Sequence, residues 1–395
     1  MQREPHVANP PGRAPAPDSY LPRVRPFHIR VEQDVLDDLE IRLGRARFAR
    51  ASDEPGWKHG TDPQYLRSLI AYWRVGFDWR RQEMKLGELP QYVARIDDND
   101  IHFVHLRSNR SAATPLLLLH GWPDSFYRYH RVAPLLAAEG YDVIIPSLPG
   151  FAFSAPLSPA PRERPTRAVA TVMQQLMTEV LGYPQFGVVG GDGGSVIAQA
   201  LAIDAHDSVT GIHVSDLGWH AMKRDPSSLS WRERRYFARN TKQFMSDGAY
   251  AMVQSTRPRS LAIELADSPV GLASWILDRF HSWSDGNLDA RFGKDMLITN
   301  IMLYWVTQSI ASSIFTYYAE VQSPSLTADD RVDRPVGMAL FPHDIGGIPP
   351  RRLAERTLSI TRWTEMPRGG HFAALEEPEL YARDVVAFFR SLEAT

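Results

Sequence analysis

The sequence predicts an α/β fold with a mostly parallel sheet and a helical insertion. Short apolar runs alternate with helical patterns between residues 116 and 214, which is typical of βαβ units. The alternation then stops, and residues 219–325 are helical in pattern and rich in aromatic side chains, before strand signals return at residues 336–341. The chain has 395 residues, of which 44% are hydrophobic, and is long enough to bury a large core.

The segment that precedes this alternation predicts an arm, a helical extension and a hairpin. Residues 1–25 are rich in proline, and we expect a disordered or loosely attached arm there. Residues 26–90 carry two apolar stripes at helical spacing, in residues 35–43 and 65–77, and predict an N-terminal helical extension. Strand-like runs on both sides of an acidic segment then predict a hairpin at residues 92–106.

The remaining elements complete an expected sheet of eight strands. Six expected strands follow the hairpin, at residues 116–119, 143–145, 186–189, 211–214, 336–341 and 358–363. Helical patterns separate or follow them at residues 129–138, 168–181, 195–204 and 378–392. We therefore assign residues 91–218 and 326–395 to an α/β core, and residues 219–325 to a helical lid that is inserted into it.

Composition excludes several classes of function. The formal net charge of −2 gives no reason to expect nucleic acid or an anionic membrane as a partner. The absence of cysteine excludes disulfides, thiolate catalysis and cysteine-ligated metals. Residues 1–22 lack the apolar stretch of a secretory signal, and no run approaches the roughly 18 apolar residues of a membrane span. We expect a soluble cytoplasmic protein, and a homodimer is compatible with the sequence.

A glycine-rich turn, GGDGG at residues 190–194, lies between the expected strand at 186–189 and a helix. A strand, a sharp turn and a helix with small residues around a central nucleophile form the nucleophile elbow of the α/β-hydrolase fold. This pattern makes Asp192 a candidate nucleophile. An aspartate can also be a simple helix cap in a flexible turn. Ser195 is a second candidate nucleophile, although it lies outside the frame of the elbow.

The elbow predicts an acid after a late strand and then a histidine near the C-terminus. Asp344 follows the strand at 336–341, and His371 comes after the strand at 358–363. Asp216 is an alternative acid because it also follows a strand, and His343 is an alternative base. Backbone N–H groups of Gly193 and Trp122, in the residues that follow the nucleophile and the strand at 116–119, are expected to form an oxyanion hole.

A carboxylate nucleophile indicates different chemistry from a serine. It attacks an sp³ carbon and forms an alkyl ester, which water activated by His371 and Asp344 would then hydrolyse, without a cofactor or metal. Epoxides and alkyl halides are the plausible substrates. Opening an epoxide creates an alkoxide that needs a general acid, which two tyrosines in the lid would supply, whereas halide release needs only N–H donors. A haloalkane dehalogenase and a non-catalytic ligand-binding protein remain the competing hypotheses.

The motifs resemble those of the epoxide hydrolases, specifically the microsomal and juvenile-hormone type with an N-terminal helical extension. The resemblance runs from about residue 26 to the C-terminus. The matching segments are WKHGTD (57–62), YWRVGFDWRRQE (72–83), HGWPDSFYRYHRVAPLL (120–136), GGDGGS (190–195), DSPVGLASWILDRFHSW (267–283), LYW (303–305), FPHD (341–344) and GGHFAALEEPEL (369–380).

The resemblance implies a role for each candidate residue. It makes Asp192 the nucleophile, Asp344 the orienting acid and His371 the base. It also places the two epoxide-activating tyrosines at Tyr250 and Tyr317, with Tyr318 next to the second of them. The implied activity is the hydrolysis of a small-molecule epoxide to a vicinal diol.

Two departures from the family pattern concern the pocket. Gly193 stands where the family usually has a bulky residue, often tryptophan, so a wall of the pocket is expected to be missing. This favours a bulky or apolar epoxide. Asp124 replaces the usual glycine after the H-G-W-P segment, where it is expected either to change the pocket mouth or to be neutral. The membrane anchor of the microsomal relatives is not found in this sequence.

Overall fold

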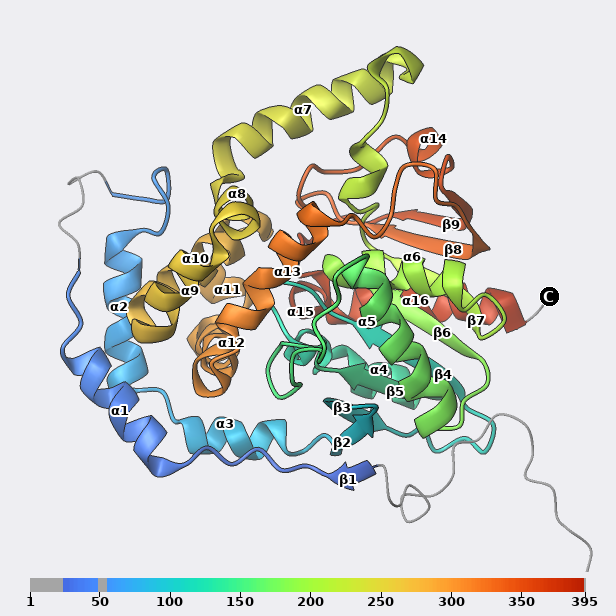
Figure 1. Ribbon diagram of the computed structural model, residues 1–395. Helices are drawn as coiled ribbons and strands as arrows, with labels where there is room; N and C mark the ends of the chain where they lie inside the picture. Colours follow the sequence, from blue (N-terminus) through green and yellow to red (C-terminus); the bar gives the residue numbers. More distant parts are fainter. Residues whose placement is uncertain (1–23, 49–54, 394–395) are drawn as a thin grey trace, which may run out of the picture.

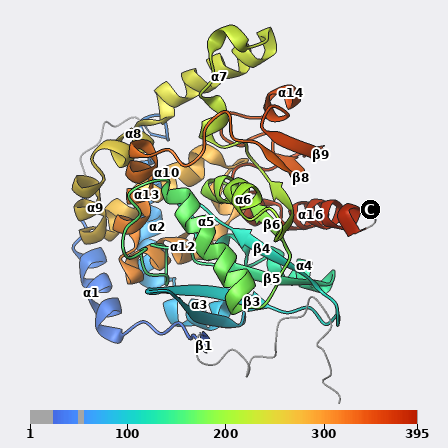
Figure 2. The same ribbon diagram turned by 45° about the vertical axis from the view of Figure 1, so that its right-hand side comes forward.

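The computed structural model describes residues 24–48 and 55–393 and confirms the predicted α/β fold. Its sheet has the strand order β1-β2-β3-β5-β4-β6-β7-β8-β9 (Figures 1 and 2). Strands β4 to β9 pair in parallel, and β1 to β3 are antiparallel at one edge. The bounds are β1 Val24–Pro26, β2 Gln91–Ile96, β3 Asn99–Leu106, β4 Thr114–Leu119, β5 Tyr141–Pro146, β6 Phe186–Gly190, β7 Val209–Val214, β8 Val332–Leu340 and β9 Leu358–Glu365.

The sheet of the described residues has nine strands, one more than the sequence predicts, because β1 was not expected. The predicted end of the loose arm at residue 25 is wrong, because residues 24 and 25, together with Pro26, pair with β2. A strand of three residues is too short for a period-two pattern to reveal it, and it forms because β2 offers free backbone groups at its outer edge. The rest of the predicted arm, residues 1–23, lies outside the described residues.

Helices cover both faces of the sheet (Figure 2). Helices α5 and α6 pack together, and α4 packs with α16. The expected helix at 168–181 is α5 followed by a π-helical turn, and the helix expected at 129–138 begins with a separate 3₁₀ turn. The bounds are η2 Phe126–Tyr129, α4 Val132–Ala138, α5 Pro165–Gln175, η3 Leu176–Val180, α6 Gly193–Asp204, α14 Arg351–Ala354, α15 Ala373–Glu376 and α16 Pro378–Glu393.

Two helical segments lie side by side at one end of the sheet (Figure 1). The first precedes β2, and the second separates β7 from β8. The bounds are α1 Gln33–Gly44, α2 Pro63–Val75 and α3 Trp79–Leu86, and then η4 Trp219–Met222, η5 Pro226–Ser228, α7 Trp231–Asp247, α8 Ala249–Thr256, α9 Pro258–Asp267, α10 Pro269–Trp283, α11 Leu288–Arg291, α12 Gly293–Thr307 and α13 Ile310–Gln322. Helices α1 and α2 contact α10, and α2 also contacts α12.

Polar contacts join these two helical segments. The Tyr65 hydroxyl donates to Asp289 at 2.6 Å, and the Tyr72 hydroxyl donates to Asp295 at 2.8 Å. The side chain of Asp62 accepts two backbone N–H groups at the start of α2 and so caps this helix.

In the part of the chain that the structure describes, no helix is both long enough and apolar enough to cross a bilayer.

Candidate active site

The glycine-rich turn between β6 and α6 is a strained elbow with Asp192 at its tip. Asp192 has φ 55° and ψ −131°, a conformation that is costly for a residue with a side chain. A Cβ atom at Gly190 would lie 2.4 Å from the carbonyl oxygen of Gly194, and one at Gly194 would lie 2.0 Å from that of Leu119. The two small positions that the elbow pattern requires are therefore needed here for steric reasons.

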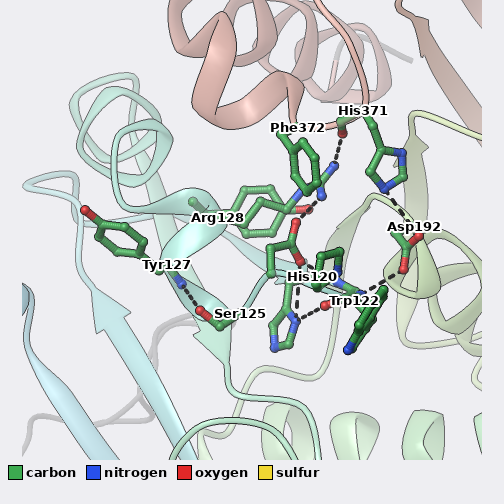
Figure 3. Close-up of polar contacts among 12 residues, drawn as sticks. His120, Trp122, Ser125, Tyr127, Arg128, Asp192, His371 and Phe372 are labelled. Carbon is green, nitrogen blue, oxygen red and sulfur yellow. Dashed lines mark hydrogen bonds and ion pairs between the residues drawn. The ribbon is translucent and has the colours of Figure 1, made fainter. Parts of the chain in front are cut away.

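The Asp192 carboxylate lies against the loop that follows β4. A Cβ atom at Gly121 would lie 2.0 Å from Asp192 Oδ1, so only glycine leaves room for the carboxylate. The backbone N–H of Trp122 donates to Oδ1 at 2.9 Å (Figure 3). The backbone N–H of Gly193 also hydrogen-bonds to this carboxylate. Both donors expected for an oxyanion hole therefore point at Asp192.

His371 lies between two carboxylates. Its Nε2 is 3.3 Å from Asp192 Oδ2, and its Nδ1 is 2.7 Å from Asp344 Oδ1. The three residues come from the carboxyl ends of β6, β8 and β9, which meet at one edge of the parallel sheet. The three predicted residues are therefore within contact distance of one another, in the order carboxylate, imidazole, carboxylate.

The charges in this row stabilise one another. Burial lowers the pKa of His371, but Asp344 and Asp192 outweigh it and raise this pKa to about 10. Burial raises the pKa of Asp192, but His371 and the N–H groups of Trp122 and Gly193 outweigh it and hold this pKa below its usual value. At neutral pH the site therefore contains an ionised Asp192 beside an imidazolium.

The alternative acid, Asp216, supports the elbow and does not contact the imidazole. Its Oδ2 accepts the backbone N–H of Asp192 at 2.9 Å and the hydroxyl of Ser195 at 2.8 Å. Its Oδ1 accepts the N–H of Gly218 at 3.0 Å. Burial, followed by the nearby carboxylates Asp344 and Asp192, raises the pKa of Asp216 to about 7. Ser195 is buried and donates its hydrogen bond away from the nucleophile position.

The alternative base His343 and the neighbouring Tyr318 are both exposed. The His343 side chain is 58% exposed, and its Nε2 lies 3.4 Å from Asp285. Tyr318 is 39% exposed, and its ring contacts Phe315. Neither side chain forms a hydrogen bond or an ion pair with Asp192.

Tyr250 of α8 and Tyr317 of α13 approach the nucleophile loop from the helical insertion. Their ring centroids are 6.1 Å apart, and they lie 5.7 Å and 5.9 Å from the indole of Trp122, whose backbone N–H binds Asp192. Burial and the charge of Asp192 raise the pKa values of Tyr250 and Tyr317. Both phenols therefore remain protonated, and so remain donors, at neutral pH.

Helix α10 contacts the loop that contains His371. This contact was not predicted from the sequence. The backbone N–H of His371 donates to the carbonyl of Trp283 at 2.8 Å, and the Trp283 ring meets the imidazole edge-on at 5.1 Å. The next residue, Phe372, stacks on Phe280 with ring centroids 4.0 Å apart. The helical insertion therefore positions the imidazole as well as supplying the two tyrosines.

A buried ion pair connects the Trp122 loop to the histidine loop. Arg128 forms an ion pair with Asp124, and its Nη2 donates to the backbone carbonyl of His371 at 2.6 Å (Figure 3). Asp124 accepts the backbone N–H of Gly121 at 3.1 Å. The side chain of Asp124 is 1% exposed, which favours the second of the two outcomes expected for it, a neutral effect on the pocket mouth.

Replacing Arg128 with methionine is expected to lower the free energy of unfolding by about 3–5 kcal/mol, because Asp124 would remain buried without its partner. Chemical denaturation measures this change. Arg351→Met is the matched control: it breaks an exposed pair with Glu355 at the same i,i+4 spacing, and we expect a loss of about 1 kcal/mol or less. Equal losses in the two variants would contradict the role assigned to the buried pair.

The site contains groups for nucleophilic and acid–base chemistry. Across residues 24–48 and 55–393, no cluster of three or more His, Asp or Glu side chains is arranged to hold a metal ion. The side chains that meet are a nucleophilic carboxylate, an imidazole with its own carboxylate partner, and two phenols. Such a set can form a covalent ester, donate a proton and activate water.

Two family models match the chain. The model described as "Epoxide hydrolase N terminus" matches residues 24–129, and the model described as "alpha/beta hydrolase fold" matches residues 114–378. Together they include the Trp122 loop, the elbow, the helical insertion and His371.

The chain is similar over most of its length to several known proteins. A protein of Stigmatella aurantiaca that is assigned as an epoxide hydrolase is 37% identical, with 94% of this chain and 86% of that protein covered. Epoxide hydrolase 1 of Sus scrofa is 33% identical, with 94% and 89% covered. The crystal structure of juvenile hormone epoxide hydrolase from Bombyx mori superposes with a TM-score of 0.86 at 26% identity, and covers 97% of this chain and 98% of that one.

Proposed function

This chain belongs to the epoxide hydrolase family, and we propose that it hydrolyses an epoxide to a vicinal diol through a covalent ester on Asp192. The observation that carries this proposal is the position of the Asp192 carboxylate. It lies between a backbone N–H of Trp122 at 2.9 Å and the imidazole of His371 at 3.3 Å, and the half-buried phenols of Tyr250 and Tyr317 lie against the Trp122 ring. This arrangement favours attack by the carboxylate followed by attack of water.

In the first step, Asp192 Oδ2 attacks a carbon of the epoxide ring. A C–O bond of the ring breaks, and its electron pair remains on the epoxide oxygen. Tyr250 or Tyr317 donates a proton to this oxygen, which would otherwise become an alkoxide. Oδ1 becomes the carbonyl oxygen of the new ester and keeps its contact with the N–H of Trp122.

After the first step, the imidazolium of His371 gives its proton to the tyrosinate, because the ester no longer carries the charge of Asp192. In the second step, water attacks the ester carbon while the neutral His371 accepts one of its protons. Negative charge moves onto Oδ1, which the N–H groups of Trp122 and Gly193 stabilise. The intermediate then releases the diol, and the oxygen that leaves Asp192 takes the proton from His371. The second proton of the water is left on the Asp192 carboxyl group and passes to His371, which restores the ionised Asp192 beside an imidazolium. Water is the only co-reactant in this scheme, so it needs no cofactor.

A single-turnover reaction in ¹⁸O-water tests this proposal, because the diol takes one oxygen from Asp192. With enzyme in excess over epoxide, the first diol is expected to be unlabelled, and the label should appear in the peptide that contains Asp192. Label in the diol after the first turnover would show that water attacks the epoxide directly. The Asp192→Asn variant serves as the control that should form no diol.

The pH dependence of the two steps is expected to differ. In the free enzyme, Asp192 and Asp344 raise the pKa of His371 to about 10. Formation of the ester removes the charge of Asp192, so the pKa of His371 should fall below this value and free the imidazole to act as a base. Stopped-flow single turnovers should show ester hydrolysis rising with pH, with an apparent pKa below about 10. A hydrolysis rate that is flat from about pH 5 to about pH 9 would contradict this role.

We also propose that residues 219–325 form a lid over the site. The substrate that we propose is an apolar or bulky epoxide. A Cβ atom at Gly193 would meet only the Cα of Gly121, at 3.8 Å, so there is open space beside the nucleophile. In Gly193→Trp, kcat/KM for a bulky epoxide is expected to fall by about tenfold or more, while a small epoxide is affected little. Gly193→Ala should leave both substrates nearly unchanged, and an equal loss for both substrates in Gly193→Trp would refute the size argument.

A further inference from the structure

Arg279 is a buried cation of α10 that has no role in the two chemical steps described above. Its side chain is 5% exposed. Its Nη1 lies 2.8 Å from Asp247 Oδ1 and also donates to the backbone carbonyl of Asp247 at 3.1 Å, and its Nη2 pairs with Asp278. Burial lowers the pKa of Arg279, but these two carboxylates outweigh it and raise this pKa overall. The guanidinium is therefore charged and held in one place.

The guanidinium lies against the ring of Tyr250. Its Cζ is 4.9 Å from the centroid of that ring and 5.4 Å from the ring of Trp283, within the range of cation–π contact. Trp283 in turn contacts His371. Arg279 thus contacts one reacting group, Tyr250, directly, and the Trp283 ring lies between it and His371.

Several charged or titratable groups face Tyr250. Burial raises its pKa most, and the carboxylates of Asp192 and Asp247 act in the same direction. Arg279 and the hydroxyl of Tyr317 lower it. Among these groups, Arg279 is the cation, and so it opposes the two carboxylates directly.

We propose that Arg279 is a positioning residue for Tyr250, whose fixed positive charge stabilises the phenolate that forms when Tyr250 gives its proton to the epoxide oxygen. This inference rests on the proposed function. It also means that Tyr250, rather than Tyr317, transfers its proton to the epoxide oxygen.

The movement of charge during ester formation supports this assignment. Asp192 loses its negative charge as its oxygen bonds to carbon, and the electron pair of the broken C–O bond takes the Tyr250 proton, so the negative charge ends on the phenol oxygen. The ring that Arg279 touches is neutral before the step and negative after it. A cation at this position therefore favours the transition state over the bound substrate, which is the condition for acceleration.

Substitutions at position 279 separate charge from shape. Arg279→Lys keeps the charge and loses the planar group, whereas Arg279→Gln keeps a planar polar group and loses the charge. The measurement is the single-turnover rate constant of ester formation and the dissociation constant of the epoxide, with the fastest substrate from a panel that includes styrene oxide. We expect Arg279→Gln to slow ester formation about tenfold without weakening binding, and Arg279→Lys to remain near the parent rate.

The same substitution in two tyrosine backgrounds tests whether Arg279 acts through Tyr250. In Tyr250→Phe, adding Arg279→Gln is expected to cause no further loss, whereas in Tyr317→Phe the loss of about tenfold should persist. Two results would overturn this inference. One is an equal loss in both tyrosine backgrounds, and the other is a normal rate of ester formation in Arg279→Gln, whatever the rate of Arg279→Lys. Both results would leave the ester mechanism intact. Failure of the parent chain to form an ester with any epoxide of the panel would overturn both.

Discussion

Replacing His371 with glutamine is expected to stop the reaction after the first chemical step. The nucleophile, the N–H donors and the two phenols remain, so the epoxide should still alkylate Asp192, but no base is left to activate water. Turnover should fall by about 10²–10⁴. Mass spectrometry of the intact chain should show the added mass of one epoxide, and peptide mapping should locate it on Asp192.

Two control variants make this result specific. In Asp192→Asn combined with His371→Gln, no added mass is expected, because the nucleophile is missing. His343→Gln should turn over normally, because the His343 side chain is 58% exposed and pairs with Asp285 and not with Asp192. A parent enzyme that is active, together with a His371→Gln variant that carries no ester, would mean that water attacks the epoxide without a covalent intermediate.

Asp192, Asp344 and His371 could be identified from the sequence because each follows a strand of the parallel sheet. The carboxyl ends of such strands meet at one edge, so their order along the chain is sufficient to bring the three residues together. The requirement for small residues around Asp192 could also be predicted, since it depends on local geometry. The pattern requires small residues because a Cβ atom at Gly190 or Gly194 would clash with the neighbouring backbone.

The pattern of strands does not separate Asp344 from Asp216, since both residues follow parallel strands, and in the sequence only the resemblance at residues 341–344 favours Asp344. Their contacts in space separate them. His371 Nδ1 lies 2.7 Å from Asp344, whereas Asp216 accepts the backbone N–H of Asp192 and so braces the elbow. A pattern of strands and loops contains no information on which of two carboxylates faces the imidazole.

The supporting residues were missed for a related reason. Arg128, Trp283 and Arg279 act through contacts between segments that are distant in the sequence, namely the Trp122 loop, the histidine loop and α10. In a sequence, an arginine at a helical position more often indicates an exposed side chain, and a tryptophan more often indicates core packing, than a role in supporting an active site. Their contacts appear only when the helical insertion is packed against the sheet, and that packing has no local signature.

Replacing both Tyr250 and Tyr317 with phenylalanine is expected to slow ester formation by about 10²–10⁴, because the epoxide oxygen would leave as an unprotonated alkoxide. Each single variant should retain part of the rate, and the two losses should not add, since both phenols donate to one oxygen. Rapid-quench measurement of the ester tests this expectation. Tyr318→Phe is the matched control, because this neighbour is 39% exposed and forms no hydrogen bond with Asp192.

The variant in which both Tyr250 and Tyr317 are phenylalanine also distinguishes the proposed reaction from halide release, which would start from attack by the same carboxylate. A chloroalkane needs no proton on its leaving group, so a dehalogenase would form its ester equally well without the two phenols. An epoxide hydrolase should instead lose its reaction with epoxides in the doubly substituted chain, and the parent should release no halide. Retention of full epoxide turnover in that chain would mean that the pair of phenols beside Trp122 serves packing, and that another group protonates the oxygen.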